Sequence, residues 1–205
     1  ENSDFKVSDI EIDIINNSSN FYLRFDGKKE KFFINGASRH SPLNAALSVA
    51  VAIYCGCPLS NIKKRLKFID LPERRLAISN SLRGSLLIDD SYNSNPASLK
   101  NAVDSLEGLK RKKVCILGDM KELGSDSQKI HQEMYEYISE RVDQIFCIGD
   151  EWSTCSPNEK KDLSIFENQD DLYSHLISII DKKTILLVKG SRSTRMDLLA
   201  DKLKE

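Results

Sequence analysis

The chain has 205 residues, of which 30 are Lys or Arg and 31 are Asp or Glu, giving a formal net charge of −1. This balance argues against a general nucleic-acid-binding protein, which needs a basic excess to neutralise phosphates. Hydrophobic residues make up 40% of the chain, enough to form the core of one to one-and-a-half domains. The most apolar stretch, residues 45–59, is too short to span a bilayer and is interrupted by Ser48 and Gly56.

The first residues of the chain have the pattern of a segment inside a domain. Its first residue is Glu1, and the segment that follows already alternates like a strand within a sheet. We therefore expect a fragment of a longer protein, and we expect no secretory signal because no basic region followed by an apolar one is present. The five cysteines and three histidines form no zinc-binding pattern, so we expect reduced, structural thiols and a cytoplasmic protein.

Residues 5–34 are typical of antiparallel strands joined by short turns. Apolar and polar residues alternate there, and the turns are marked by an Asn-rich run and an Asp-Gly pair. The expected strands lie at 7–14, 21–25 and 32–34, and the turns at 16–20 and 26–27.

Two helices are expected next. The first runs from Pro42 to about Tyr54, because proline is favoured at the first helical position and Ser41 can cap the helix. The second follows Ser60 and ends at Leu71-Pro72. Its apolar face would be formed by Ile62, Leu66 and Ile69.

The pattern changes in the second part of the chain, where short continuous apolar runs alternate with amphipathic helices. Such runs predict a parallel sheet covered on both faces, and right-handed crossovers make it doubly wound and Rossmann-like. The fold class is therefore α/β, with a doubly wound, mainly parallel sheet from about residue 78 to the end, preceded by an antiparallel hairpin and helices. The apolar runs lie at 86–88, 114–117, 145–148 and 185–188, with a weaker one at 163–166. The helices are expected to begin at Asn95-Pro96, at a capping box in 125–128, and before Leu172 and Met196.

Ligands of open parallel sheets bind beyond the carboxyl ends of the strands. Four loops are selected by this rule: 89–96, 118–124, 149–152 and 189–195. The first two are rich in acids and amides and the last is basic, so together they could hold a zwitterion.

Several residues in and near these loops also have structural interpretations. Asn95 can simply cap a helix, and the Asp89-Asp90 pair can start a turn. Lys189 and Arg192 can be exposed charges, although cations are unfavourable near a helix start unless an anion docks there. Residues expected to be structural or to lie in the core are His131, His175, Met120 and Met134.

Phosphate-binding signatures are missing from the sequence. Neither G-x-G-x-x-G after a strand nor G-x-x-x-x-G-K-[ST] occurs in the 205 residues. The first absence argues against a nicotinamide-dependent dehydrogenase. If ATP is used, its phosphates are bound elsewhere.

Four motifs in the same order make the pattern specific. They are RHSPLNAA (39–46), LIDDSYNSNP (87–96), LGDMKELG (117–124) and VKGSRS (188–193). With them the chain closely resembles the Mur ligases, and within that family the branch that adds D-alanyl-D-alanine to UDP-N-acetylmuramoyl-tripeptide. The resemblance covers nearly the whole chain.

The resemblance implies ATP-dependent amide formation through an acyl phosphate, with Mg²⁺ and cationic side chains offsetting the developing charge. Residues 1–76 would be the end of the central ATPase domain and 77–205 the C-terminal domain. The implied cofactors are ATP and Mg²⁺, the partners are the UDP-linked tripeptide and the dipeptide, and the expected state is a monomer. The phosphate loop would lie upstream, so we expect the 205 residues alone to be inactive and assign neither a catalytic residue nor a metal ligand.

The resemblance also implies roles for individual residues. His40 and Asn44 would bind ATP, with Asn44 at the adenine. Arg75 would lie near ATP at the junction of the domains, and Asp90 would meet the ribose. Those implied to line the substrate cleft are Tyr92, Asn93, Asn95 and Asp119, and those implied to approach the dipeptide or stem peptide are Lys189, Ser191 and Arg192.

The sequence departs from the family pattern at two places. Ser41 stands where the family usually has asparagine, and its shorter side chain weakens the case for an adenine contact there. The turn Pro72–Leu76 is one residue longer than usual, so either Arg74 or Arg75 could be the arginine at the domain junction.

Two other functions remain open from the sequence. A phosphoacceptor signalling receiver also has an acidic pair after one strand and a lysine after the last, with Asp150 as the candidate acceptor. A binding module that has lost catalysis is the other alternative.

Overall fold

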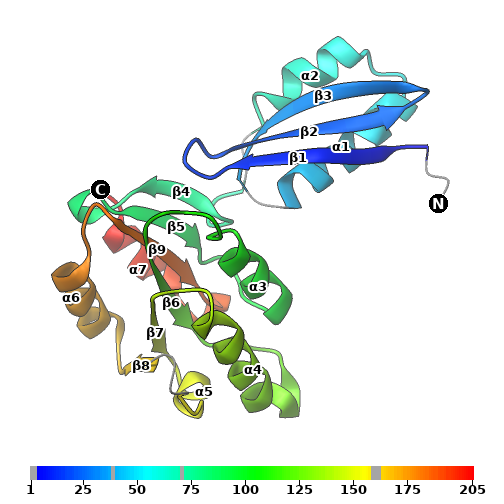
Figure 1. Cartoon of the computed structure of the whole chain (residues 1–205). Coiled ribbons are helices and arrows are strands. Elements are labelled where there is room, and N and C mark those ends of the chain that lie inside the picture. The colour runs from blue at the N-terminus through cyan, green and yellow to red at the C-terminus, as the bar shows by residue number, and fades with distance from the viewer. Residues whose placement is uncertain (1–3, 38–39, 70–71, 158–162) are drawn as a thin grey trace. The chain divides into compact units, whose positions relative to one another are not determined.

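Two separately packed units, Glu1–Pro72 and Glu73–Glu205, make up the chain in a computed structural model (Figure 1). The structure describes residues 4–37, 40–69, 72–157 and 163–205. Arg39 and Leu71, which the sequence placed at a motif and a helix end, lie outside the described residues.

The first unit is an antiparallel sheet with two helices packed on it. The sheet has the order β1-β2-β3, and β2 buries alternate side chains, Phe21, Leu23 and Phe25, against the helices. A tight turn joins β2 to β3 with positive φ at Asp26 and Gly27, as a two-residue hairpin turn requires. The elements are β1 (Lys6–Asp13), β2 (Ser18–Phe25), β3 (Lys28–Asn35), α1 (His40–Tyr54) and α2 (Leu59–Leu66).

Several boundaries in this unit differ from expectation, and β3 begins at Lys28, four residues before the expected strand. Strand β2 begins at Ser18, inside the expected turn, because the backbone pairs with both neighbours there and Ser19 Oγ donates to Gly36 O at 2.6 Å. Helix α1 begins at His40, so the prediction that Ser41 is its N-cap was wrong. Pro42 is tolerated inside the first turn because an N–H there has no intrahelical partner to lose. Ile69 lies outside α2 and is exposed.

The second unit is a sheet with the order β4-β5-β9-β6-β7-β8. All of its pairings are parallel except that of β4 with β5, so the expected α/β fold with a mainly parallel sheet is confirmed. The antiparallel strand β4 was not expected from the sequence. The strands are β4 (Ala77–Asn80), β5 (Leu86–Asp90), β6 (Lys112–Gly118), β7 (Gln144–Ile148), β8 (Leu163–Phe166) and β9 (Thr184–Lys189).

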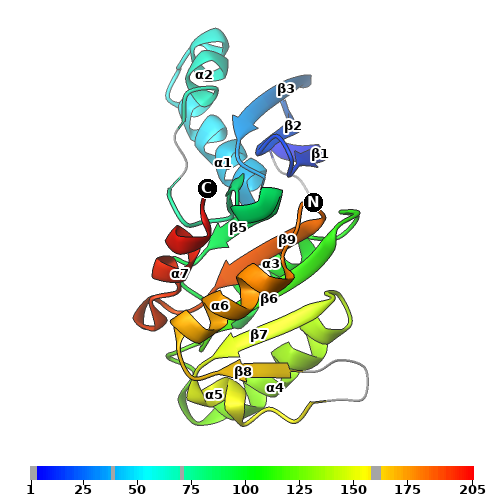
Figure 2. The same cartoon turned by 90° about the vertical axis from the view of Figure 1, so that its left-hand side faces the viewer.

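Helices cover both faces of this sheet. Figures 1 and 2 show α3 and α4 on one face and α6 and α7 on the other. The second pair packs Leu172, Leu176 and Leu199 onto side chains of the central strands. The helices are α3 (Pro96–Asp104), α4 (Ser127–Ser139), α5 (Asp150–Ser153), α6 (Gln169–Ile179) and α7 (Met196–Leu203).

Local capping chemistry explains one of the expected helix starts and fails at another. Asn95 caps α3, and its side chain forms a reciprocal capping box with Ser98. The capping box expected before α4 is absent, because Gly124–Asp126 forms a 3₁₀ turn and the side chain of Asp126 makes no capping hydrogen bond.

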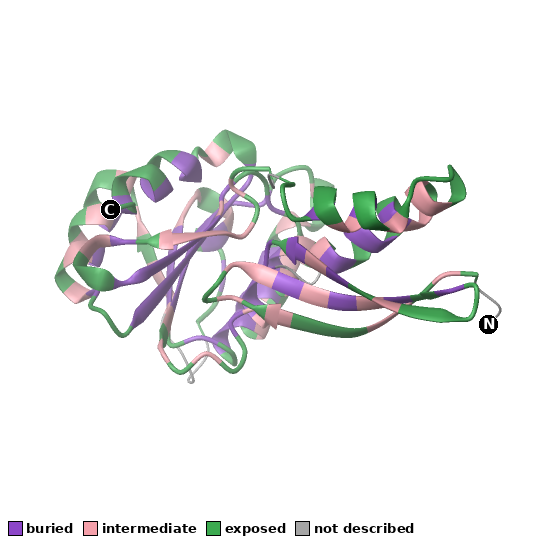
Figure 3. Cartoon of the chain, turned by 90° about the horizontal axis from the view of Figure 1, so that it is seen from above, coloured by how far each residue is buried: buried purple, intermediate pink, exposed green. Residues whose placement is uncertain are grey.

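Burial explains why β9 lies in the middle of the sheet. Every residue of this strand is buried, and Figure 3 shows the strands of the larger sheet buried along much of their length, in contrast to β1. Cys115 and Cys147 are buried in neighbouring strands, where burial raises the pKa of the Cys115 thiol to about 12. None of the described helices has the length and apolar character needed to cross a lipid bilayer.

Removing Lys204 should destabilise the second unit. Its ammonium pairs with the fully buried carboxylate of Asp89 at 3.1 Å, and the Lys204→Ala substitution would leave that charge without its counterion. We expect the free energy of unfolding to fall by about 2 kcal/mol, less than for a fully buried pair because Lys204 is partly exposed. Urea unfolding of the chain measures the change.

Lys202→Ala is the matched control. Lys202 pairs with the exposed carboxylate of Asp170, so its loss should change the free energy of unfolding by less than about 0.5 kcal/mol. Equal effects of the two substitutions would contradict the assigned role of Lys204.

Candidate functional site

Strand register brings the polar loops of the second unit to one edge of the sheet. Asp90 is the partner of Lys189 in the pairing of β5 with β9, and Lys189 is the partner of Leu117 in the pairing of β9 with β6. Gly118 is in turn opposite Ile148 of β7. The loops that follow β5, β9, β6 and β7 therefore all leave the sheet at the same edge.

A buried ion pair joins the first and last of these loops. Lys189 Nζ lies 2.5 Å from Asp90 Oδ2 and donates to Asn93 O at 2.8 Å. The Lys189 side chain is only 2% exposed, so its charge is used inside the protein. Asp90 also accepts from the backbone N–H of Leu76 at 3.0 Å. Burial raises the pKa of Asp90, and the charge of Lys189 acts in the opposite direction.

Asp119 joins three of the loops. Its carboxylate pairs with Lys121 Nζ at 2.9 Å and its backbone oxygen accepts from Ser191 N at 3.0 Å. The backbone N–H of Trp152 points to the same carboxylate at 3.4 Å. Ser191 Oγ accepts from the backbone N–H of Lys121 at 2.8 Å. Lys121 was not among the site residues predicted from the sequence, although it stands two residues after the loop aspartate Asp119.

Glycine is required where these loops approach each other. A Cβ atom on Gly149, which has φ +131°, would lie 2.2 Å from the carboxyl carbon of Asp119. A Cβ atom on Gly118 would lie 2.5 Å from Thr194 Oγ1. The absence of a side chain at both positions is therefore a condition for the packing of the loops.

The two arginines at the start of the second unit have different environments. Arg74 donates to Asp201 Oδ2 at 2.8 Å and to Asp197 O at 3.0 Å, and the bond to Asp201 raises the pKa of Arg74. Arg75 is exposed, and its guanidinium lies 4.6 Å from the ring centroid of Tyr92. Arg75 is thus the arginine presented to solvent, whereas Arg74 fixes the chain to α7.

The other expected site residues of the second unit lie at the surface. Tyr92 is 48% exposed, and Asn93 and Asn95 are also exposed. The side chain of Asn95 is used as the cap of α3, and that of Asn93 accepts from the backbone N–H of Ser94 at 2.9 Å.

His40 and Asn44, the expected nucleotide residues of the first unit, lie on the first turns of α1. Both are exposed. Their spacing of four residues places them on the same face of the helix.

His131 has the structural role expected for it, and it also holds the loop after β6. The ring is buried against Trp152, its Nε2 accepts from Met120 N at 3.0 Å, and its Nδ1 lies 2.8 Å from Ser127 O. Met120 and Met134 are buried core residues, as expected.

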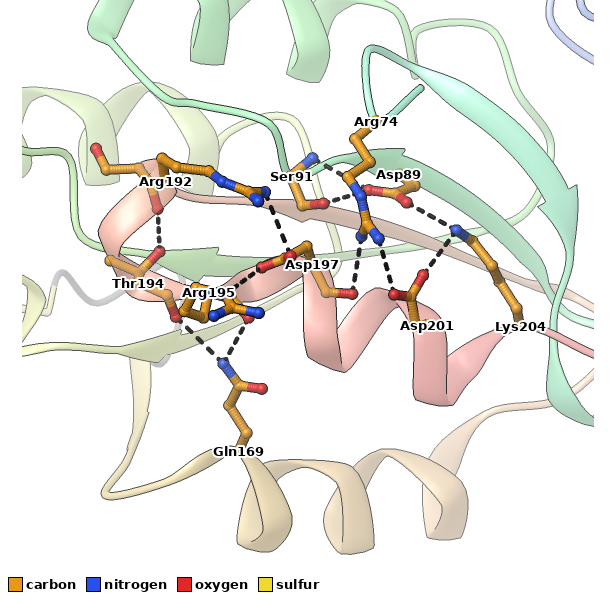
Figure 4. A network of polar contacts seen from close by, with 11 residues as sticks. Arg74, Asp89, Ser91, Gln169, Arg192, Thr194, Arg195, Asp197, Asp201 and Lys204 are labelled. Atoms are coloured by element: carbon orange, nitrogen blue, oxygen red, sulfur yellow. Dashed lines mark hydrogen bonds and ion pairs between the residues drawn. The ribbon is translucent and has the colours of Figure 1, made fainter. Parts of the chain in front are cut away.

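Arg192 and Asp197 belong to an extended polar network on α7 and the loop before it (Figure 4). Arg192 Nη1 lies 3.3 Å from Asp197 Oδ2. Among the described residues, no group of three or more His, Cys, Asp or Glu side chains could hold a metal ion.

Comparison with known proteins identifies the family. A protein-family model described as "Mur ligase, glutamate ligase domain" matches residues 74–192, more than half of the chain. The chain belongs to the Mur ligase family.

Individual relatives agree with this assignment. The UDP-N-acetylmuramoyl-tripeptide–D-alanyl-D-alanine ligase of Haemophilus influenzae is 32% identical over 81% of this chain and 37% of its own length. A crystal structure of MurF from Acinetobacter baumannii is 30% identical, with a TM-score of 0.85 over 98% of this chain and 46% of that one. MurF from Thermotoga maritima, crystallised with ADP, has the same fold at 21% identity, with a TM-score of 0.83 over 98% of this chain and 46% of that one. The chain thus spans less than half the length of these relatives.

The structure of this Mur ligase chain also excludes the receiver alternative. In a receiver of the flavodoxin-like order, the lysine-bearing last strand lies at the edge of the sheet. Here the last strand, β9, lies between β5 and β6, and its lysine pairs with Asp90. Asp150 instead begins α5.

Gly149→Ala should displace Asp119 and destabilise the second unit. The new Cβ atom has no space beside the Asp119 carboxylate, so we expect a loss of about 2–4 kcal/mol in the free energy of unfolding. The matched control is Gly108→Ala, since Gly108 also has a positive φ but a Cβ atom added there would have no other atom within 4 Å. That control should lose about 1 kcal/mol, and equal losses in urea unfolding would contradict the steric explanation.

Proposed function

We propose that the complete protein is an ATP-dependent ligase that joins D-alanyl-D-alanine to UDP-N-acetylmuramoyl-tripeptide in peptidoglycan precursor synthesis. The observation that carries the proposal is the likeness to a MurF structure at 30% identity over 98% of this chain, because it includes both units and the polar edge of the larger sheet. The named activity of the Haemophilus influenzae relative points to the same reaction.

The chemistry of the proposed reaction requires an activated carboxylate. A carboxylate oxygen of the tripeptide attacks the γ-phosphorus of ATP, the bond to the β-phosphate oxygen breaks, and ADP leaves. The neutral amine of the dipeptide, having lost a proton from its ammonium form, then attacks the acyl carbon and expels inorganic phosphate. A second-substrate site contributes by holding the amine close to the acyl phosphate, which replaces a bimolecular encounter by a positioned one.

We assign residues 1–76 to the end of a central ATPase domain and 77–205 to the C-terminal domain. The nucleotide-binding residues of this assignment are His40, Asn44, Arg75 and Asp90. ADP in the Thermotoga maritima structure supports a nucleotide as substrate. The exposed guanidinium of Arg75, stacked on Tyr92, is available for an anionic or aromatic part of the nucleotide. We assign no Mg²⁺ ligand, because the described residues contain no suitable cluster.

The second-substrate residues of the proposal are those at the carboxyl edge of the larger sheet. Arg192 is exposed and can pair with a carboxylate, while Lys189 acts indirectly by fixing the loop after β5. The remaining residues assigned to this site are Tyr92, Asn93, Asn95, Asp119 and Ser191.

We also propose that the protein acts as a monomer in the cytoplasm. The free thiols of Cys115, Cys147 and Cys155 support a reducing compartment, since all three are buried without a disulfide.

Activity measurements test the proposed reaction directly. The full-length protein, incubated with ATP, Mg²⁺, the UDP-linked tripeptide and D-alanyl-D-alanine, should form the amide product and release one phosphate for each product. The 205-residue chain alone should form none, because its sequence has no G-x-x-x-x-G-K-[ST] loop. Absence of product with the full-length protein would refute the function, and product from the 205-residue chain would refute the domain assignment.

Arg75→Ala in the full-length protein should weaken ATP binding. Loss of one charge-assisted contact predicts a rise of about tenfold in the KM for ATP, with the KM for the dipeptide changed less than about twofold. Arg65→Ala, which removes an exposed arginine of α2, is the control and should leave both values unchanged. An unchanged KM for ATP in the Arg75 variant would remove this residue from the site.

A further inference from the structure

Asp197 is a buried carboxylate that holds two exposed arginines (Figure 4). Its side chain is 6% exposed, and its two oxygens lie 3.3 Å from Arg192 Nη1 and 3.2 Å from Arg195 Nε. The side chains of the two arginines are 58% and 55% exposed. One acid therefore fixes two guanidinium groups near each other while more than half of each remains open to solvent.

The backbone that carries these arginines is held by hydrogen bonds from two directions. Thr194 Oγ1 donates to Ser191 O at 2.6 Å within the loop. Gln169, from the start of α6, donates to Thr194 O at 3.2 Å and to Arg195 O at 3.0 Å. The backbone of the two arginines is thus held by these hydrogen bonds, and their guanidinium groups are held by Asp197.

Charge is unevenly distributed in this network. Arg74 and Lys204 are balanced by Asp89 and Asp201, so that part of the network is neutral. At the other end, the single charge of Asp197 faces two arginines.

An excess positive charge therefore remains on the two exposed arginines. It contrasts with Lys189, which is buried and neutralised by Asp90. Lys189 is therefore not available for an external carboxylate, whereas the arginines held by Asp197 are.

We propose that Arg195 is a second carboxylate-binding residue beside Arg192, that the two together receive the C-terminal carboxylate of the incoming dipeptide, and that Asp197 is their positioning residue. The inference rests on the function proposed above. A single carboxylate matches the single excess charge, and each guanidinium still has N–H donors beyond the nitrogen that contacts Asp197.

The proposed function supplies the dipeptide as the source of the carboxylate. The backbone oxygen of Asp119 bonds to Ser191 N, so an acidic side chain lies beside the loop that carries the arginines. That side chain is buried and already paired with Lys121, so the arginines are the groups offered to the carboxylate, and the dipeptide is taken as its source from the function proposed above.

Initial-rate kinetics of the full-length enzyme test the proposal with two acceptors. D-alanyl-D-alanine has the terminal carboxylate, and D-alanyl-D-alaninamide keeps the reacting amine but lacks that charge. We expect the unaltered enzyme to prefer the dipeptide over the amide by about tenfold or more in kcat/KM. Equal use of the two acceptors would overturn the proposal without any substitution.

Arg195→Asn removes the charge with little change of backbone, because asparagine tolerates the left-handed conformation found there (φ 51°). We expect the KM for the dipeptide to rise about tenfold and the preference over the amide to fall by a similar factor, with KM for ATP and for the tripeptide unchanged. Lys202→Ala, which removes another cation from α7, is the control and should change none of these values. A retained preference, or a change in the KM for the tripeptide instead, would overturn the assignment.

Asp197 is tested by its conservative variants. Asp197→Asn should raise the KM for the dipeptide with little change in kcat, and Asp197→Glu should restore part of the preference because it restores the charge. An equal fall of kcat/KM for both acceptors in both variants would leave the preference for the dipeptide intact and would show a merely structural role. If the unaltered full-length protein makes no amide at all, the proposed function fails; if it is active and Arg195→Asn changes nothing, only this inference fails.

Discussion

The buried ion pair between Lys189 and Asp90 is the interaction on which the polar edge of the sheet depends. An ammonium that is 2% exposed is tolerated only if its charge is compensated and its hydrogens are bonded. Asp90 and the backbone oxygen of Asn93 meet both requirements, so the loop after β5 is fixed to the end of β9. Because β9 is the central, fully buried strand, a loop attached to it is attached to the most stable part of the unit.

Five cations of the second unit fall into two groups by their exposure. Lys189, Arg74 and Lys204 are held by acids inside the unit and stabilise it. Arg75 and Arg192 are presented to solvent, one on the ring of Tyr92 and the other on Asp197. A site that recognises anions needs the second group, but its geometry is supplied by the first.

Local chemistry made much of the fold predictable. Asn95 followed by proline starts α3 because an Asn side chain caps the exposed N–H groups, and this signal needs no distant partner. The start of α4 and the first residues of β2 were misjudged, since a 3₁₀ turn replaced the capping box and Ser19 pairs in the sheet despite its polarity. Backbone pairing and turn geometry depend on neighbours that a local pattern does not contain.

The sequence by itself determined the α/β class, the loops at the carboxyl ends of the strands and the resemblance to the Mur ligases. All three depend on patterns within short contiguous segments. Only the tertiary structure decided which cations are buried and which are exposed. Lys189 and Arg192 are close in sequence and look alike as charges, yet one is neutralised by an acid 99 residues away and the other is held at the surface by Asp197. Burial and charge compensation are set by long-range packing, and the chemical role of each cation follows from them.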